Sequence, residues 1–462
     1  MATAAVRPPV TPQGARLRQP VGLALLFVAE MWERFSYYGM RALLILYLVD
    51  QSGVFRWTQQ SASQLYGWYT GLVWFTPILG GYLADRYLGT HKSLVIGATV
   101  ISLGHFALAL ERQSVFFLGL ILIILGTGFF KSNVSTMVGQ LYKEDDPRRD
   151  AGFTFFYMGI NLGAFIGPLI CGYLAADPRF GWGYAFGAAG VGMVLGLIVY
   201  LVFRRRYLGD IGLVPAGQTR VGDTVAAKRP LTPEERDRVL AIVIVVFFST
   251  FFWLASEQAG SSLNLFALER TNRAVTGFVG RFLPNYEVPT AWFQSATPFF
   301  VVTLSPLFGL LWDRLGESQP STATKMAYGL LLLSLGYMII TLGAFRSDTG
   351  TLVSPAYLIA CYFFITCGEI CLYPLGLSFV SKVAPVKYSS ALMGIFFLSL
   401  FAASLLGGYV AGTVKAVERG QVYHVLGGRA DFFLMFVITS ILAGVFLLLL
   451  VPTIKRLTHG RG

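Results

Sequence analysis

One apolar stretch near the start of the chain carries an unusual number of ionisable and phenolic side chains. The run is about long enough to cross a bilayer as a helix, and its polar members are Glu30, Glu33, Arg34, Tyr37, Tyr38 and Arg41. At about 100° per residue, all six fall within an arc of roughly 140° on one helical face. A charge at the bilayer centre costs from ~2.5 to more than 10 kcal/mol, so this face is expected to point into a helical bundle or an aqueous cavity.

These side chains suit two kinds of chemistry. Carboxyl groups removed from water can exchange protons near neutral pH, and a guanidinium group can hold a carboxylate through two parallel hydrogen bonds. Glu30 and Arg34 have the i,i+4 spacing of an ion pair within one helix. A structural ion pair that locks one helix to another is the alternative, but the stretch contains more carboxylates, guanidinium groups and phenols than such a lock requires.

The composition is that of an integral membrane protein, since 55% of the 462 residues are hydrophobic and 13% are charged. A net charge of +12 would suggest a nucleic-acid partner in a soluble chain. Here Lys and Arg concentrate between apolar runs, which is typical of membrane topology. We therefore expect the lipid bilayer, and no nucleic acid, as a partner. The four cysteines lie in apolar runs and are expected to be buried free thiols.

Apolar runs separated by Gly, Pro and charged residues predict an all-α fold with twelve transmembrane helices. The expected spans are 20–49, 60–85, 93–111, 114–139, 150–175, 182–203, 237–267, 289–312, 323–345, 353–381, 388–414 and 431–453. The distribution of Lys and Arg predicts that both termini are cytoplasmic. The expected organisation is a cytoplasmic tail (1–19), an N-terminal six-helix bundle (20–203), a cytoplasmic linker (204–236), a C-terminal six-helix bundle (237–455) and a second cytoplasmic tail (456–462).

A repeated turn supports the division into two halves. The second expected span ends in Asp85-Arg86 and the eighth ends in Asp313-Arg314. Asp can meet the positive amino end of a neighbouring helix and Arg can meet carbonyl groups and phosphates, so we expect these pairs to latch the cytoplasmic side. The turn resembles the loop signature of the major facilitator superfamily, whose fold has two six-helix halves around a central cavity.

Within this superfamily, the sequence is similar to the proton-dependent oligopeptide transporters. The motifs that carry the resemblance are Glu30-Met-Trp-Glu33-Arg34-Phe-Ser-Tyr-Tyr38, Phe156-Tyr157-Met-Gly-Ile-Asn161 and Gly368-Glu369-Ile-Cys-Leu-Tyr-Pro374, with further likeness around Lys131 and Glu257. The resemblance implies a proton-coupled symporter that imports di- and tripeptides by alternating access. It implies a carrier rather than an enzyme, with the proton as coupling ion and neither cofactor nor metal. We expect a monomer in a bacterial inner membrane.

A peptide substrate is a zwitterion, so its site must supply both signs of charge. Arg34, Arg41 and Lys131 are intramembrane cations that can hold the carboxylate, and Glu369 is the matching anion. The resemblance places the equivalent of Glu369 near the peptide amine and in a salt bridge with the equivalent of Lys131, whereas a purely structural pair is the alternative. Further expected peptide contacts are Tyr37, Tyr38 and Asn161. Candidates for side-chain pockets are Trp68, Tyr69, Trp74, Phe266, Trp292, Phe293 and Tyr373.

Coupling needs a group that exchanges protons near neutral pH. Desolvation raises the pKa of a carboxyl group, and a nearby cation lowers it again. Glu257 has no intramembrane cation close in sequence, which makes it the best candidate for the principal proton carrier, as the resemblance also implies. A linked acid–base set around Arg34 is expected to contribute. The residues expected to couple protons are Glu30, Glu33, Arg34, Lys131, Glu257 and Glu369.

Two positions depart from the family pattern. Thr297 precedes Pro298 where many relatives carry Asn, so recognition of the peptide amine should depend more on Glu369. Gly67 stands where animal relatives have a His, which leaves proton handling to carboxyl groups. A carrier of nitrate or another small organic anion is the alternative function, but it would not require an amine-binding acid. A membrane-embedded enzyme or a channel is disfavoured, because the sequence has no metal-ligand cluster, nucleophile elbow or phosphate-cradling loop.

Overall fold

The computed structural model of the chain describes residues 18–143, 146–215, 231–275, 281–282, 286–385 and 388–459. Within these ranges the secondary structure is helical, apart from two isolated β-bridges that pair Thr271 with Val353 and Ala274 with Glu287. This confirms the expected all-α fold. The expected tails (1–19 and 456–462) and linker (204–236) lie partly outside the described residues.

The first part of the chain, called the N half below, is built from long helices. Their bounds are α1 (Val21–Val49), α2 (Gln59–Leu83), α3 (Thr90–Ala109), α4 (Gln113–Gln140), α5 (Arg149–Ala176) and α6 (Trp182–Tyr207). Helix α2 continues into one π-helical turn, Ala84–Leu88. Helix α1 packs against both α5 and α6. Near the end of α1, Tyr47 is fully buried among the rings of Phe55, Phe116 and Phe186, which anchors this helix in the N half.

The second part, called the C half below, starts with a strong helix-initiation signal. The hydroxyl of Thr232 accepts a hydrogen bond from the backbone N–H of Glu235, whose carboxylate accepts one from the N–H of Thr232, and Pro233 is the first helical residue. The helices that follow are α7 (Pro233–Ser256), α8 (Ser262–Glu269), α10 (Ala296–Leu315), α11 (Thr322–Ser347), α12 (Ala356–Val383), α13 (Ser389–Gly412), α14 (Val414–Glu418) and α15 (Gly428–Leu457).

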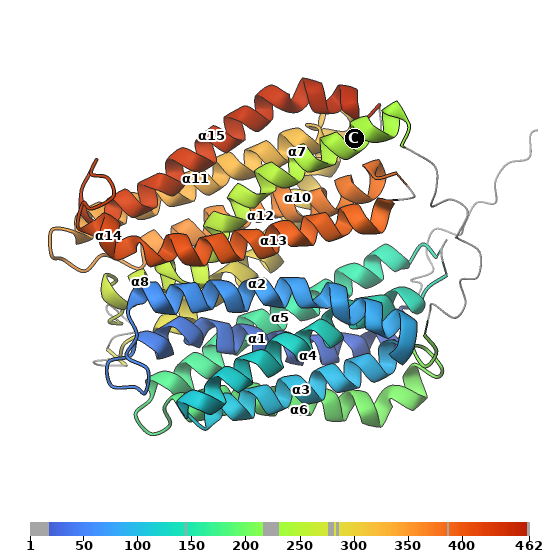
Figure 1. Cartoon of the computed structure of the whole chain (residues 1–462), viewed down its shortest axis with the longest axis horizontal. Helices are drawn as coiled ribbons and strands as arrows, with labels where there is room; N and C mark the ends of the chain where they lie inside the picture. The colour runs from blue at the N-terminus through green and yellow to red at the C-terminus, as the bar shows by residue number, and fades with distance from the viewer. Residues whose placement is uncertain are drawn as a thin grey trace, which may run out of the picture.

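Ten helical segments of the described chain are long and apolar enough to cross a membrane. Helices α1 and α2 fall short of that criterion although they lie alongside the others (Figure 1). The two helices fall short for different reasons: α1 carries four charged residues, whereas α2 is rich in Gln, Gly and Thr. Together with these two helices, the ten segments correspond to the twelve expected spans. The protein is therefore a multi-pass membrane protein.

The two halves lie side by side and approach each other most closely at one end (Figure 1). We call the end where α1 begins and α15 ends the terminal end, and the opposite end the distal end. On the distal side, a Cβ added to Gly67 of α2 would lie 2.8 Å from the Cα of Gly408 of α13. Further toward the terminal end, the rings of Phe75 and Phe401 still meet at 5.7 Å, and beyond them α2 and α13 diverge (Figure 1).

The seventh expected span, 237–267, is interrupted at a residue assigned to proton coupling. Helix α7 ends at Ser256, and a 3-10 turn over Glu257–Gly260 (η4) precedes α8. The turn lies against α2, where a Cβ added to Gly260 would lie only 1.7 Å from the hydroxyl oxygen of Tyr66. Only glycine permits this approach, and the break turns Glu257 toward the N half.

Gly80→Ala is expected to lower the melting temperature of the purified protein. An added Cβ would lie 2.0 Å from the carbonyl oxygen of Gly128, so α2 and α4 would have to move apart. Overpacking of this kind typically costs about 1–3 kcal/mol. Gly309→Ala in α10 is the matched control, because a Cβ there meets no atom within 4 Å. Equal melting temperatures for the two variants in detergent would contradict the close α2–α4 packing.

Candidate functional site

A cavity of about 160 Å³ lies between the two halves, at the point where the polar face of α1 meets the C half. Its N-half walls come from α1, α2, α4 and α5, and its C-half walls come from α7, η4, α10, α12 and the 3-10 turn Thr290–Ser295 (η5). Charged side chains from both halves line it. We call it the central cavity.

The cations of the central cavity all belong to the N half. They are Arg34 and Arg41 of α1 and Lys131 of α4. Arg34 lies 3.2 Å from Glu30, which confirms the expected i,i+4 ion pair. Arg34 also donates to both carboxylate oxygens of Glu33, which is buried and lies behind the cavity wall. Two carboxylates therefore orient one guanidinium group on this wall.

Lys131 is held by an aromatic ring rather than by an acid. Its Nζ lies 3.4 Å from the centroid of the Trp74 ring, within the range of a cation–π interaction. In the described part of the chain no ion pair joins Lys131 to Glu369, so the salt bridge that the family resemblance implied is absent from this conformation. The two residues belong to opposite halves, which diverge toward the terminal end.

Glu257 does have a cationic partner, contrary to the expectation from its sequence neighbourhood. The Arg41 guanidinium lies 2.7 Å from the Glu257 carboxylate and also donates to the hydroxyl of Tyr66 at 2.6 Å. The pair joins α1 to the turn after α7 and is 13% and 10% exposed. Close by, Asn264 of α8 donates to the backbone carbonyl of Ala42 at 2.9 Å. These contacts close the distal side of the central cavity.

The remaining predicted peptide contacts divide into two groups. Tyr38, Asn161 and Glu369 line the central cavity. Tyr37 is buried in the N half, where its ring stacks on Tyr69 at 6.4 Å, and it does not line the cavity. Its expected contact with a peptide stays a prediction, although in this conformation the side chain faces the N-half core and not the central cavity. The reason is the 100° step between adjacent helical residues, which turns one tyrosine inward and its neighbour toward the cavity.

Among the aromatic residues proposed for side-chain pockets, only Trp74 and Tyr373 line the central cavity. The others serve packing. Phe266 lies in the C-half core against Phe433, and Trp68 donates to Tyr409 on an exposed part of the α2–α13 contact. The remaining three are Tyr69, Trp292 and Phe293, which are buried or bonded at helix contacts.

Some cavity residues were missed by the sequence analysis. Trp253 and Ser256 precede Glu257 by one turn or less on α7, so helical spacing from Glu257 could have identified them. Tyr157 precedes Asn161 by one turn on α5 in the same way. Gln294 lies in a 3-10 turn and donates to the carbonyl of Ala259, a placement that α-helical periodicity does not predict.

The four residues of the expected latch lie at the terminal end. Asp85 and Arg86 follow α2, and Asp313 and Arg314 end α10. All four are exposed, and Arg86 donates to the hydroxyl of Tyr82 at 2.8 Å. Among the described residues no ion pair joins the two turns. Their role as a latch stays a prediction for a conformation in which the terminal end is closed.

Comparison with known proteins identifies the family. The sequence matches the family model of the POT family over residues 91–210 and 218–426, which is more than half of the chain. The chain belongs to the POT family.

Curated proteins similar to this POT-family chain match it over nearly their full length. The peptide transporter YePEPT of Yersinia enterocolitica subsp. palearctica is 34% identical, with 96% of both chains covered. A di-/tripeptide transporter of Lactococcus lactis subsp. cremoris is 32% identical over 95% of this chain and 96% of that one. An uncharacterized transporter of Bacillus subtilis, YclF, is 36% identical over 97% of both.

Solved structures of the POT family have the same fold. The peptide transporter POT in complex with sulfate superposes with a TM-score of 0.85 at 34% identity and 98% coverage of both chains. A mutant of a peptide transporter POT in complex with alafosfalin gives 0.84 at 34% identity, covering 96% of this chain and 97% of that one. A POT family transporter in complex with 5-aminolevulinic acid gives 0.85 at 30% identity, covering 96% and 99%. The expected major facilitator architecture is confirmed.

Arg41→Gln is expected to destabilise the purified protein by roughly 3–5 kcal/mol, because it leaves the buried carboxylate of Glu257 without its partner. The double variant Arg41→Gln/Glu257→Gln should recover part of this loss, since neither charge then remains unpaired. Thermal unfolding of both single variants and the double variant gives the coupling energy. Arg419→Gln, at an exposed distal residue, is the control for loss of a positive charge. Additive effects of the two substitutions would contradict the pairing.

Proposed function

We propose that this POT-family chain is a proton-coupled symporter that imports di- and tripeptides by alternating access. One observation carries the proposal: the three cations of the central cavity, Arg34, Arg41 and Lys131, belong to the N half, whereas the C half contributes only acids, Glu257 and Glu369. The one acid on the N-half wall, Glu30, is paired with Arg34. A short peptide has one charge of each sign and fits this separation. The names of the similar proteins, which include di-/tripeptide transporters, support the same substrate class.

The cavity suggests how each end of the peptide is held. Arg34 presents a planar guanidinium group oriented by Glu30 and Glu33, which suits a carboxylate, and Lys131 adds a second cation. Glu369 forms no ion pair with any described residue and is available to the peptide ammonium. Asn161 and Tyr38 can hydrogen-bond the peptide backbone. A carrier of nitrate or another small anion would not need Glu369.

Proton coupling follows from the contact that closes the distal side. Protonation of Glu257 removes the charge that Arg41 binds, so it weakens the link between α1 and the turn after α7. Loss of that link favours the conformation in which the distal side is open. The acid–base set of Glu30, Glu33 and Arg34 responds in the same way when a peptide carboxylate takes over the guanidinium group.

The topology completes the proposal. Three consecutive arginines, Arg204, Arg205 and Arg206, lie in the last turn of α6 at the terminal end, which favours a cytoplasmic location for that end and for both termini. The bacterial relatives support a bacterial inner membrane as the location. The conformation described above is then closed to the outside. In the opposite conformation the turns at Asp85-Arg86 and Asp313-Arg314 would latch the cytoplasmic side. The proposed unit is a monomer, since each central cavity is formed within one chain.

Liposomes that contain the purified protein are expected to take up dialanine and trialanine together with protons. The measurement is peptide-dependent acidification of the lumen, followed with an enclosed pH dye, alongside uptake of labelled dialanine. Unlabelled di- and tripeptides should compete, and nitrate should not. Competition by nitrate without any effect of peptides would favour the small-anion carrier and contradict the proposal.

Glu257→Gln is expected to abolish accumulation of dialanine against its gradient, because the amide cannot carry a proton. Counterflow exchange of labelled for unlabelled dialanine should persist, since it needs binding and conformational change but no net proton movement. A carboxyl group introduced at the neighbouring position by Gln258→Glu is not a matched control. The Gln258 amide donates to the backbone carbonyl of Gly407, and the substitution would remove that donor. Undiminished uphill uptake by the Glu257→Gln variant would remove this residue from the coupling mechanism.

A further inference from the structure

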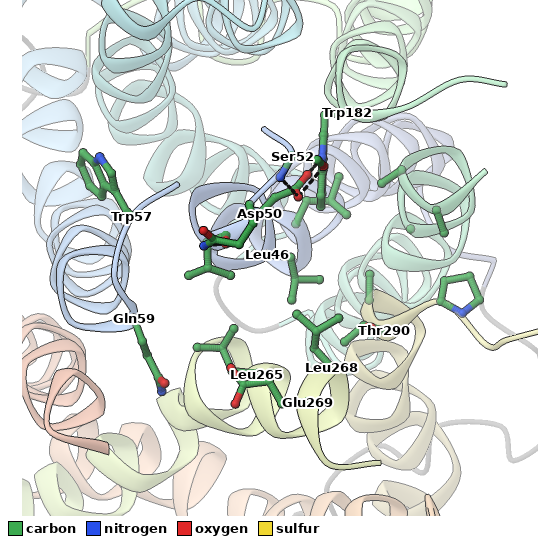
Figure 2. Close-up of a pocket in the computed structure, with 18 of the residues that line it drawn as sticks. Leu46, Asp50, Ser52, Trp57, Gln59, Trp182, Leu265, Leu268, Glu269 and Thr290 are labelled. Atoms are coloured by element: carbon green, nitrogen blue, oxygen red, sulfur yellow. Dashed lines mark hydrogen bonds between the residues drawn. The ribbon is translucent and has the colours of Figure 1, made fainter. Parts of the chain in front are cut away.

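A second and larger cavity lies at the distal end, between the halves (Figure 2). Its volume is about 730 Å³, within the range of small-molecule sites. The ends of α1, α2, α5 and α6 form the N-half wall, and α8, η5 and α14 form the C-half wall. We call it the outer vestibule. It is separate from the central cavity, with which it shares no lining residue.

A layer of apolar side chains separates the two cavities. Leu43 and Leu46 of α1, with Leu265 of α8 and Ala291 of η5, line the vestibule and are buried. In the sequence, Leu43 and Leu46 follow Arg41, and Leu265 and Ala291 follow Glu257. At 1.5 Å per residue, Asp50 in the vestibule lies about 13 Å along α1 from Arg41. A ligand in the vestibule would therefore stand outside the closed distal side without touching the central site.

The C-half wall of the vestibule carries two cations, Lys415 and Arg273, and one acid, Glu269. Lys415 lies 3.5 Å from Glu269 and 3.1 Å from Glu418. The same two carboxylates also bind Arg429, which is only 1% exposed, at 2.6 and 3.4 Å. Because the buried Arg429 shares these acids, Lys415 keeps donor capacity, and 46% of its side chain is exposed. Arg273 adds a second cation to this wall, where it is paired with Glu287 at 2.9 Å and donates to the backbone carbonyl of Val288 at 3.0 Å.

The N-half wall presents an anion. Asp50 follows the last residue of α1 and accepts hydrogen bonds from the Trp182 indole N–H at 2.8 Å and from the backbone N–H of Ser52 at 2.9 Å (Figure 2). Partial burial acts to raise the pKa of the Asp50 carboxyl, but the hydrogen bonds from Ser52 and Trp182 outweigh it and lower this pKa below its ordinary value. Asp50 is therefore ionised at neutral pH, opposite the cations of the C half.

Between the charged walls lies an amide without a hydrogen-bond partner. Gln59, the first residue of α2, lines the vestibule and is 9% exposed, and both its Nε2 and Oε1 are buried and unpaired. A buried polar group in this condition costs about 1–3 kcal/mol. A ligand that offers a donor and an acceptor together, as a peptide bond does, would satisfy both atoms once rotation of the Gln59 side chain exposes its amide to the vestibule.

We propose that the outer vestibule is a second binding site for a short zwitterionic peptide. Its carboxylate binds Lys415 and Arg273, its ammonium binds Asp50, and its peptide bond meets Gln59. The proposal rests on the proposed function for the class of ligand, but it concerns a different site. Because its walls belong to different halves, the vestibule exists only while the distal side is closed, so a bound peptide stabilises that conformation. Abundant external peptide should therefore slow the return to the conformation that is open outside.

The test is protection of an engineered thiol by dialanine. Gln51 lines the vestibule and is exposed, whereas the four native cysteines are buried, so Gln51→Cys creates an accessible site for a water-soluble maleimide. Dialanine is expected to slow labelling several-fold. N-acetyl-dialanine amide, which lacks both terminal charges, should protect little. Equal labelling rates with and without dialanine would overturn the proposal.

Further substitutions in the Gln51→Cys background locate the ligand. Arg273→Gln with Lys415→Gln should abolish protection, whereas Arg419→Gln, which removes an exposed distal charge outside the vestibule, should preserve it. Protection should survive Glu369→Gln, which impairs the central site. Protection that is lost with Glu369→Gln, or that persists without Arg273 and Lys415, would assign the effect to the central cavity and refute the vestibule site. Failure of dialanine uptake by the unaltered protein would instead refute the proposed function.

Discussion

The cost of placing charges in a low-dielectric interior governs this structure. A guanidinium or carboxylate group far from water needs a partner, and Arg41 of the N half finds Glu257 of the C half. Each half contributes only one member of this pair. The contact between the halves is therefore stabilised by an ion pair as well as by packing. Other charges find partners within one half, as Arg34 does with Glu30 and Glu33. Pairs within one half, such as Arg34 with Glu30, stabilise one wall of the cavity, whereas the Arg41–Glu257 pair forms only when the two halves are in contact.

Much of the site could be read from helical periodicity. The stripe on α1 predicted which face of that helix would carry Glu30, Arg34, Tyr38 and Arg41, and these four line the central cavity. The prediction succeeds because the cost of exposing such groups to lipid leaves one acceptable direction for the stripe. It loses precision on one side of the stripe, where Glu33 and Tyr37 turn into the N-half core. Composition and apolar run lengths were likewise sufficient for the all-α membrane fold.

What the sequence could not provide were contacts between distant segments. Glu257 lacks a cation nearby in sequence, yet Arg41, more than two hundred residues earlier, binds it. The break after α7 was missed because nothing local ends a helix at Ser256; the close approach of Tyr66 to Gly260 lies in another element. The separation of Lys131 from Glu369 reflects how far the two halves diverge, which is a property of the conformation rather than of either residue.

The weak membrane character of α1 has a consequence for biosynthesis. A helix with four charged residues partitions poorly into lipid by itself, and α2, the next to emerge, is also too polar to compensate. The helices that bury α1, namely α5 and α6, are synthesised roughly a hundred residues later. We therefore expect the first helix to stay beside the insertion machinery until its neighbours arrive. Assembly of the N half is then a cooperative event and not a sequence of independent insertions.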